Sequence, residues 1–244
     1  MSLRRKLIQV IIGINESIFF YPKLMKFYRQ YFKDKPIRII DVGVNKGQSI
    51  DFFSKLSNTI TVYGFEPNRK LYDILTRKYA GKPNITLINK GVSSRKGMLT
   101  FHENVMDETS TFEELNYNSE YLQKKAKILG VKPENIVVGK YDVEVETLSG
   151  FLQGQDSFFD ILKIDVEGHE LSVLQGLFTA GYETAVCPVR FIQLESHNDN
   201  MYKNTELNKA KINELLKKNG FELTETIKHG FGDFSEIIYQ NTRT

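Results

Sequence analysis

From residue 37 onward, short apolar segments alternate with segments whose apolar residues recur at helical spacing. The apolar segments are IRIID, VYGFE, ITLIN, FDILKID and VRFIQLE, and all except ITLIN precede an amphipathic segment. This alternation is typical of a mostly parallel sheet with helices on both faces. Near the end, FELTETIK and FSEIIYQN flank a short turn and predict an antiparallel hairpin at the sheet edge. The sequence therefore predicts a doubly wound α/β fold.

Residues 1–36 precede this pattern and predict an N-terminal helical arm. Their apolar residues recur every three or four positions, and a second helix is expected after Pro22. The apolar face of the arm is expected to pack on its own domain or on a second copy of the chain, giving a homodimer. A helix lying on a membrane surface is less favoured, because the cationic side chains near its start are only Arg4, Arg5 and Lys6.

Residues 97–158 interrupt the alternation within the domain, which spans residues 37–244. They predict a strand at GMLTFHEN, a helix at NSEYLQKKAKILG and one or two strands at NIVVGKYDVEVETL. The polar segment ENVMDETSTFEELN predicts a mobile loop over the carboxyl edge of the sheet. We therefore expect this insert to shape the binding site of the substrate.

The composition is typical of an ordinary globular protein of 244 residues, with 41% hydrophobic and 26% charged residues. The single cysteine, Cys187, precedes an apolar run and is expected to be a buried structural thiol. A net charge of +3, dispersed along the chain, argues against a nucleic-acid partner. The apolar start is too short to span a bilayer and lacks a cleavage pattern, so no transmembrane segment and a cytoplasmic location are expected.

The segment IRIIDVGVNKGQS combines the first strand with a glycine-containing turn. In open α/β sheets, ligands bind outside the carboxyl ends of the strands, and this turn lies there. Gly43 and Gly47 permit positive φ angles and a close approach to a ligand, and Asn45 is the non-glycine residue that best tolerates the left-handed region. The turn is therefore expected to contact a ligand.

Two classes of cofactor compete for such a turn. A dinucleotide site has the pattern GxGxxG, whereas this turn has GxNxG, and the carboxylate of Asp41 would repel a pyrophosphate. The same carboxylate suits S-adenosylmethionine, which carries cationic amino and sulfonium groups. Glu66, at the end of the second strand, is placed to accept hydrogen bonds from ribose hydroxyls in either class. A glycine turn without any cofactor and a nicotinamide-dependent dehydrogenase remain alternatives.

Two later strands end in polar segments, DILKIDVEGHEL and FIQLESHND. Strand alternation predicts that Lys163, Asp165 and Glu167 share one side, with residues of the second segment beside them. Transfer of a group to an alcohol requires loss of its proton, so Asp165 is the first candidate for orienting or deprotonating a hydroxyl. His197 is the second, because imidazole titrates near neutrality.

A metal ion is also conceivable at these strand ends, since Asp165, Glu195 and His197 are able to hold Mg²⁺. The spacing is not diagnostic of a metal, and each acid can equally be a helix cap or a solvated strand-end residue. His169 is either a residue of the first turn of a helix or part of the site, whereas His102 and His229 are expected to be structural.

The motifs IIDVGVNKGQS, VYGFEPNRKLYDIL, INKGVSSRKGMLTF, VEVETL and DILKIDVEGHELSVLQG, followed by FIQLESH, occur in this order. Together they resemble the FkbM-type S-adenosylmethionine-dependent methyltransferases. The resemblance covers about residues 37 to 197 and not the N-terminal arm. It implies a class I, Rossmann-like methyltransferase fold whose last two of seven strands form the antiparallel hairpin. It also implies O-methylation of hydroxyls on sugars, glycans or related natural products, with S-adenosylhomocysteine as product.

The resemblance further implies a set of site residues. Those assigned to the cofactor are Asp41, Gly43, Val44, Asn45, Gly47, Ser49, Glu66, Pro67, Gly91, Val92, Ser93 and Asp165. Those assigned to the reaction centre are Lys163, Asp165, Glu167, Glu195 and His197. The acceptor is then a small molecule or a glycan. N-methylation of protein or nucleic acid is an alternative, disfavoured by the lack of an Asn-Pro-Pro-Tyr-like motif, and a non-catalytic nucleoside-binding module is another.

Overall fold

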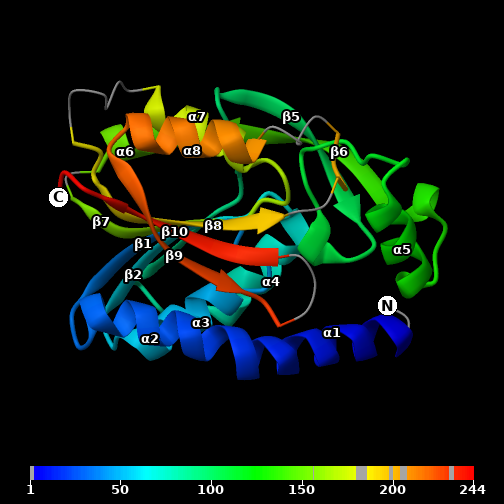
Figure 1. Ribbon diagram of the computed structural model, residues 1–244, viewed down its shortest axis with the longest axis horizontal. Helices are drawn as coiled ribbons and strands as arrows, with labels where there is room; N and C mark the ends of the chain where they lie inside the picture. The colour runs from blue at the N-terminus through cyan, green and yellow to red at the C-terminus, as the bar shows by residue number, and fades with distance from the viewer. Residues whose placement is uncertain (1–2, 156, 180–185, 198–199, 204–207, 231–233) are drawn as a thin grey trace.

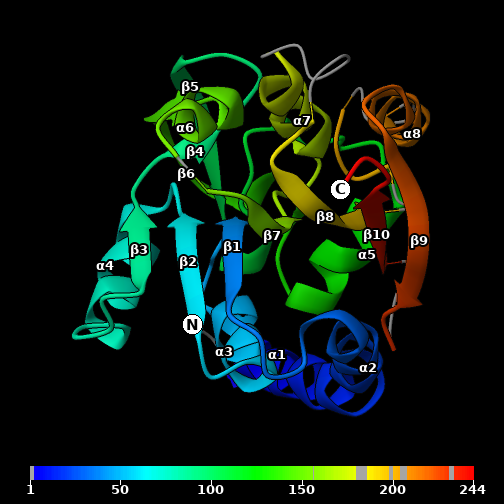
Figure 2. The ribbon, with the colours of Figure 1, turned by 90° about the vertical axis from the view of Figure 1, so that its left-hand side faces the viewer.

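The computed structural model describes residues 3–155, 157–179, 186–197, 200–203, 208–230 and 234–244. Its centre is a seven-stranded sheet (Figures 1 and 2). In spatial order the strands are β3 (Ile85–Ile88), β2 (Ile60–Phe65), β1 (Ile37–Val42), β7 (Phe159–Ile164), β8 (Val189–His197), β10 (Phe234–Asn241) and β9 (Phe221–Lys228). The first five are parallel, whereas β10 is antiparallel to β8 and β9. The predicted mostly parallel sheet with an antiparallel hairpin at its edge is confirmed.

Helices cover both faces of this sheet, as the sequence predicts (Figure 1). On one face lie α2 (Tyr21–Phe32), α3 (Gln48–Leu56) and α4 (Arg69–Lys78), and on the other lie α6 (Leu148–Gln153), α7 (Glu170–Phe178) and α8 (Asn208–Lys218). Strand alternation separates the two cores: Ile39 packs with the α2 side and Ile40 with the α7 side.

The N-terminal arm consists of α1 (Leu3–Asn15), a π-helical turn (Glu16–Phe20) and α2. The second half of the arm belongs to the core of the domain, because Phe20, Leu24 and Phe27 are buried in the same cluster as the strand residues. Along α1, by contrast, apolar side chains remain exposed. None of the described helices combines the length and apolarity that crossing a membrane requires.

The insert forms a separate three-stranded sheet of β4 (Gly91–Val92), β6 (Val137–Glu146) and β5 (Gly97–Asn104), in that order. It also contains α5 (Glu120–Leu129) and two 3₁₀ turns, at Asp107–Thr109 and Pro133–Asn135. The expected one or two strands after α5 are a single strand, β6. The segment between β5 and α5 folds back onto β5, where the backbones of His102 and Thr111 exchange hydrogen bonds of 2.8 and 3.1 Å.

Candidate active site

The turn after β1 adopts the backbone conformations that its sequence predicts. Gly43 and Gly47 have φ angles of +89° and +83°, and Asn45 has a φ of +52°. A Cβ atom on Gly43 would lie 1.9 Å from the backbone oxygen of Asp165, so only glycine permits this contact between the two strand ends. The turn and the end of β7 therefore form one wall.

Asp41 lies at the end of β1 and is completely buried. One carboxylate oxygen accepts a hydrogen bond from the Ser49 hydroxyl. The other, Oδ1, has no hydrogen-bond partner among the described residues, although Lys163 Nζ lies 3.9 Å away. Burial raises the pKa of Asp41, and the Lys163 charge and the Ser49 hydrogen bond only partly oppose this. The carboxylate is therefore short of one polar partner.

Glu66, at the end of β2, is fixed by the backbone of two neighbouring turns. Its Oε1 accepts from the Asn68 amide at 2.8 Å and its Oε2 from the Asn45 amide at 2.7 Å. Burial raises the pKa of Glu66 to about 8, although both amides lower it. Each oxygen keeps one further lone pair, so the carboxyl group remains able to accept from a ligand.

Polar side chains occupy adjacent positions on three neighbouring strands. Asp41 pairs with Lys163 and Lys163 with Gln193, so the three side chains share one face of the sheet. Gln193 Oε1 accepts a hydrogen bond of 2.7 Å from the hydroxyl of Tyr28, on α2. Burial lowers the pKa of Lys163, but the charges of Asp165 and Asp41 raise it by more than burial lowers it. The pKa is therefore above the ordinary value of a lysine, and Lys163 is a cation.

An acidic cluster lies directly beyond this row. Carboxylate oxygens of Asp165, Glu167 and Glu195 all lie within 4.8 Å of one another. Lys163 Nζ donates to Asp165 Oδ2 at 3.0 Å, and the Tyr202 hydroxyl donates to Glu167 Oε2 at 2.6 Å. The cluster contains three of the five predicted reaction-centre residues, and Lys163, a fourth, contacts it.

The reason that Glu167 reaches the cluster differs from the predicted one. Strand β7 ends at Ile164, and Glu167 has a left-handed φ of +54°, so strand alternation does not extend to it. A turn, continued by Gly168 with a φ of +96°, directs the side chain instead. This prediction was right about the place and wrong about its cause.

Three clustered carboxylates have the chemistry of a divalent-cation site. Glu167 joins Asp165 and Glu195, which are two of the three ligands in the predicted metal site. The side chain of His197 is outside the described part of the structure, so its roles as base and as ligand stay predictions.

Sequence reasoning missed two titratable residues near the cluster. Glu236 on β10 pairs with Glu195 and is almost fully buried. Burial raises its pKa to about 7, opposed by Lys163 and reinforced by the charge of Glu195. His229 was expected to be structural, but its ring stacks on Phe20 with centroids 4.1 Å apart, and both rings line the site. Glu236 is an acid within the otherwise largely apolar segment FSEIIYQN, and this position could have indicated a buried functional carboxyl group.

These groups surround a cavity of about 190 Å³ at the carboxyl ends of the strands. Among the predicted residues, its walls include Gly43, Val44, Asn45, Ser49, Glu66, Pro67, Lys163, Asp165, Glu167 and Glu195. Asp41 and Gly47 lie behind this wall, Asp41 in contact with Ser49. The arm contributes Glu16, Phe20 and Tyr21, which no motif indicated.

The structure does not bring Gly91, Val92 or Ser93 to this cavity. All three are buried: Gly91 and Val92 form β4 of the small sheet, and the Ser93 hydroxyl lies 2.9 Å from Nε2 of His169. Their expected place beside the cofactor therefore stays a prediction, and the structure shows them in the packing between β4 and α7. Of the two roles left open for His169, this contact favours a structural one.

The model of the methyltransferase FkbM domain matches residues 41–223 of this chain. The chain therefore belongs to the FkbM methyltransferase family, and the resemblance noted in the sequence is confirmed. The protein is a methyltransferase, and its strand order is that of the class I methyltransferase fold.

Two curated relatives are methyltransferases. The chain is 29% identical to "Methyltransferase sdnD" of Sordaria araneosa over 203 residues, covering 76% of this chain and 74% of that protein. It is 27% identical to "Hexuronic acid methyltransferase AglP" of Haloferax volcanii over 161 residues, covering 64% of this chain. The match spans only 54% of AglP.

Similar solved structures include methyltransferases with bound cofactor. Fibrillarin from Aeropyrum pernix, solved with natively bound S-adenosyl-L-methionine, has a TM-score of 0.46 and 13% identity, covering 85% of this chain and 67% of its own. M. capricolum TrmK, solved with S-adenosyl-homocysteine, has a TM-score of 0.47 and 9% identity, covering 89% and 67%. At these identities the likeness concerns the fold alone.

Proposed function

We propose that the protein transfers a methyl group from S-adenosylmethionine to a hydroxyl of a sugar, a glycan or a related natural product. The observation that carries this proposal is the acidic cluster of Asp165, Glu167 and Glu195 beside the glycine turn. The name of AglP, a hexuronic acid methyltransferase, supports a sugar as the acceptor class. An acid cluster suits an acceptor that must give up a proton.

The residues of the cavity fit the cofactor. Gly43 and Asn45 expose backbone at its wall, and Glu66 presents a fixed carboxyl group for the ribose hydroxyls. The partner-less Oδ1 of Asp41 and the nearby cluster favour the cationic end of the molecule. When bound, the cofactor supplies a methyl group on a positively charged sulfur, which a hydroxyl oxygen can displace.

The cluster acts on the acceptor side of this reaction. Lys163 donates to Asp165 and stabilises its ionised form, so we assign Asp165 to orienting the acceptor hydroxyl. Carboxylate oxygens of all three residues lie within 4.8 Å of one another, so a hydroxyl held at Asp165 has further proton acceptors beside it. The cluster is therefore assigned as the general base that takes the hydroxyl proton while the oxygen–carbon bond forms.

The test is methyl transfer from methyl-labelled S-adenosylmethionine to a panel of acceptors: a neutral hexose, a hexuronic acid and a short glycan, with a protein mixture and an RNA as nitrogen acceptors. We expect label on a hydroxyl oxygen. Glu195→Gln should lower kcat about 100-fold or more, because it removes one carboxylate of the base. Glu222→Gln, at an exposed position of β9, is the matched control and should leave kcat unchanged. Label on protein or nucleic-acid nitrogen, and on no hydroxyl, would contradict the proposal.

A further inference from the structure

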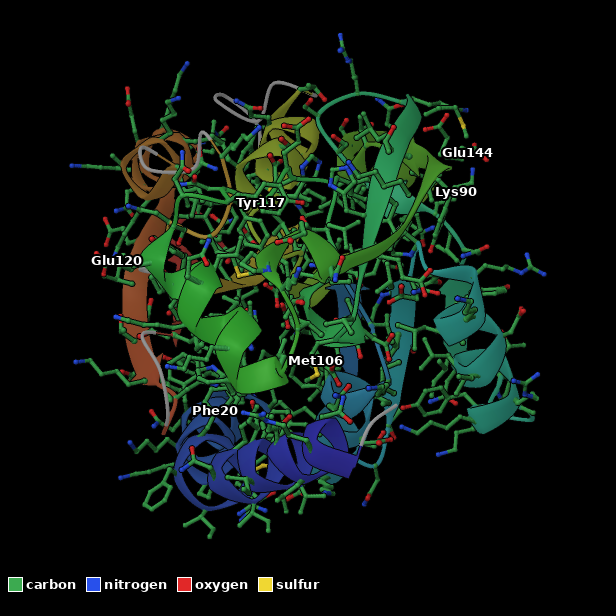
Figure 3. The ribbon with its side chains drawn as sticks, turned by 90° about the vertical axis from the view of Figure 1, so that its right-hand side faces the viewer. Phe20, Lys90, Met106, Tyr117, Glu120 and Glu144 are labelled. Atoms are coloured by element: carbon green, nitrogen blue, oxygen red, sulfur yellow. The ribbon has the colours of Figure 1, made fainter. Side chains whose placement is uncertain are left out.

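A second and larger cavity, of about 990 Å³, lies between α1 and α5. Ile8 and Ile12 form part of its α1 wall, and Ile128 and Leu129 form part of its α5 wall. Figure 3 shows α1 and α5 lying on either side of Met106, which also lines this groove. Its volume is at the upper end of the roughly 300–1,000 Å³ that small-molecule sites usually occupy.

Polar contacts hold the two walls of the groove together. Arg4 on α1 donates to the backbone oxygen of Lys127 on α5 at 3.2 Å. Gln9 on α1 donates to Glu108, in the 3₁₀ turn of the insert, at 2.8 Å. The groove therefore lies where α1 of the arm contacts α5 and the 3₁₀ turn of the insert.

The groove is continuous with the reaction site. Glu16, Tyr21, Glu167, Glu195 and His229 line both the groove and the smaller cavity. The apolar groove between the helices therefore adjoins, through mostly polar side chains, two members of the acidic cluster. A molecule whose hydroxyl reaches the cluster can place its remainder in the groove.

We propose that the groove binds an apolar chain of the acceptor, so that the substrate is a hydroxyl compound carrying an alkyl or isoprenoid chain. This inference rests on the proposed function and narrows its substrate class. Burying apolar surface against the isoleucine walls stabilises such a complex, whereas a free sugar leaves these walls in water. Each buried methylene contributes roughly fourfold in affinity, so three of them give about fiftyfold.

A neighbouring side of α1, called here its outer side, provides a matched control. Ile8 and Ile12 are one turn apart and line the groove, whereas Ile11 and Ile14 do not line it. Ile11, Ile12 and Ile14 are all exposed, so the two pairs differ in lining the groove and not in exposure. An apolar occupant of the groove depends on the first pair. A membrane surface or a second copy of the chain seated on the outer side of α1 depends on the second.

The first experiment uses octyl β-glucoside and methyl β-glucoside, below the micellar concentration and with S-adenosylhomocysteine present. Protein labelled with ¹³C at the methionine methyl groups reports the place of binding. We expect the Met25 and Met106 signals to shift with octyl β-glucoside only, because both residues line the groove. The signal of Met98, which is 60% exposed on β5, should not move.

The second experiment compares variants by the same titration. The double variant Ile8→Gln, Ile12→Gln should weaken octyl β-glucoside binding about tenfold, and so should Ile128→Gln from the opposite wall. Ile11→Gln, Ile14→Gln should bind as the wild type does. If circular dichroism shows that the variant Ile8→Gln, Ile12→Gln is unfolded, Ile128→Gln alone decides the outcome.

Two results would overturn the inference. One is equal binding of both glucosides, or shifts at Met98 as large as at Met25. The other is a loss of octyl β-glucoside binding in the outer variant and not in the groove variants, which would assign the apolar contact to the outer side of α1. Calorimetric titration of S-adenosylhomocysteine separates this failure from failure of the proposed function. If S-adenosylhomocysteine binds and the octyl chain does not, only the groove inference falls.

Discussion

On the face of the sheet that α2 covers, the first halves of β1, β7 and β8 carry Ile39, Ile161 and Phe191 in one row. Two residues further along, the same strands carry Asp41, Lys163 and Gln193. Both rows are buried and regular, so backbone geometry does not distinguish them.

The two rows differ in what compensates their burial. The apolar row is packed against aromatic side chains of α2, and the rings of Phe27, Tyr28, Tyr31 and Phe32 surround Phe191. The polar row depends on a few directional contacts from Tyr28, Ser49 and Asp165. The apolar row therefore stabilises the domain, whereas burial of the polar row costs stability and places charged groups at the cavity.

The largest expected effect tests the apolar row. Phe191→Ala removes a fully buried ring and should lower the free energy of unfolding by about 3–5 kcal/mol, measured by urea denaturation. The folded variant should still bind S-adenosylhomocysteine. Phe158→Ala, at a position that is 40% exposed, is the control and should change stability little. A loss of stability below about 1 kcal/mol for Phe191→Ala would contradict the stabilising role of the apolar row.

The next effect tests the glycine turn beside the polar row. Gly43→Ala and Gly81→Ala share a left-handed φ, which alone costs about 1–2 kcal/mol. Only at Gly43 would the new Cβ meet a backbone atom, whereas Gly81 has no atom within 4 Å. We therefore expect Gly43→Ala to cost more stability and to abolish S-adenosylhomocysteine binding. Equal behaviour of the two variants in thermal unfolding and calorimetry would show that the close approach is unimportant.

A smaller effect concerns the buried acid beside the polar row. Glu236 has a pKa of about 7 in the folded protein, raised by burial from about 4.5, so the folded state keeps a proton that the unfolded state loses. Its contribution to stability is present below about pH 4.5 and is lost as the pH rises through 7. Between pH 5 and 8 the wild type should lose about 2 kcal/mol relative to Glu236→Gln, measured by urea denaturation. Parallel changes of the unfolding free energy with pH in the wild type and Glu236→Gln would contradict this expectation.

The smallest effect concerns the contact between α2 and the polar row. Tyr28→Phe removes the hydrogen bond to Gln193 and should cost about 1 kcal/mol of stability, because the amide oxygen loses its donor. The ring packing against Phe191 is kept, so the loss should be smaller than that of Phe191→Ala. A loss of stability as large as that of Phe191→Ala would contradict the smaller contribution of the polar row to stability.

The sequence predicts those features that depend on local periodicity. Strand and helix alternation indicated the sheet and its terminal hairpin, and glycine conformation indicated the turn at Gly43 and Gly47. Residues at the ends of parallel strands, such as Asp165 and Glu195, could be placed at one edge because parallel strands end together.

The remaining site residues depend on contacts between distant segments. Glu236 joins the cluster because β10 inserts between β8 and β9, and strand order is not encoded in spacing. Glu16 and Phe20 line the cavity because the arm docks on the sheet, which an amphipathic pattern indicates without naming the partner surface. Ser93 contacts His169 at the start of α7, and β4 pairs with β6 of the insert, contacts that no spacing in the sequence indicates.

The most direct test of the account is calorimetric titration of S-adenosylhomocysteine into the wild type, Asp41→Ala, Glu66→Ala and a control, Asp142→Ala, in the small sheet. We expect micromolar binding by the wild type and the control, and at least tenfold weaker binding by the folded Glu66→Ala and Asp41→Ala variants, since each loses a carboxyl group that shapes the site. No binding by the folded wild type, or equal binding by all four proteins, would contradict the assignment of this cavity to the cofactor.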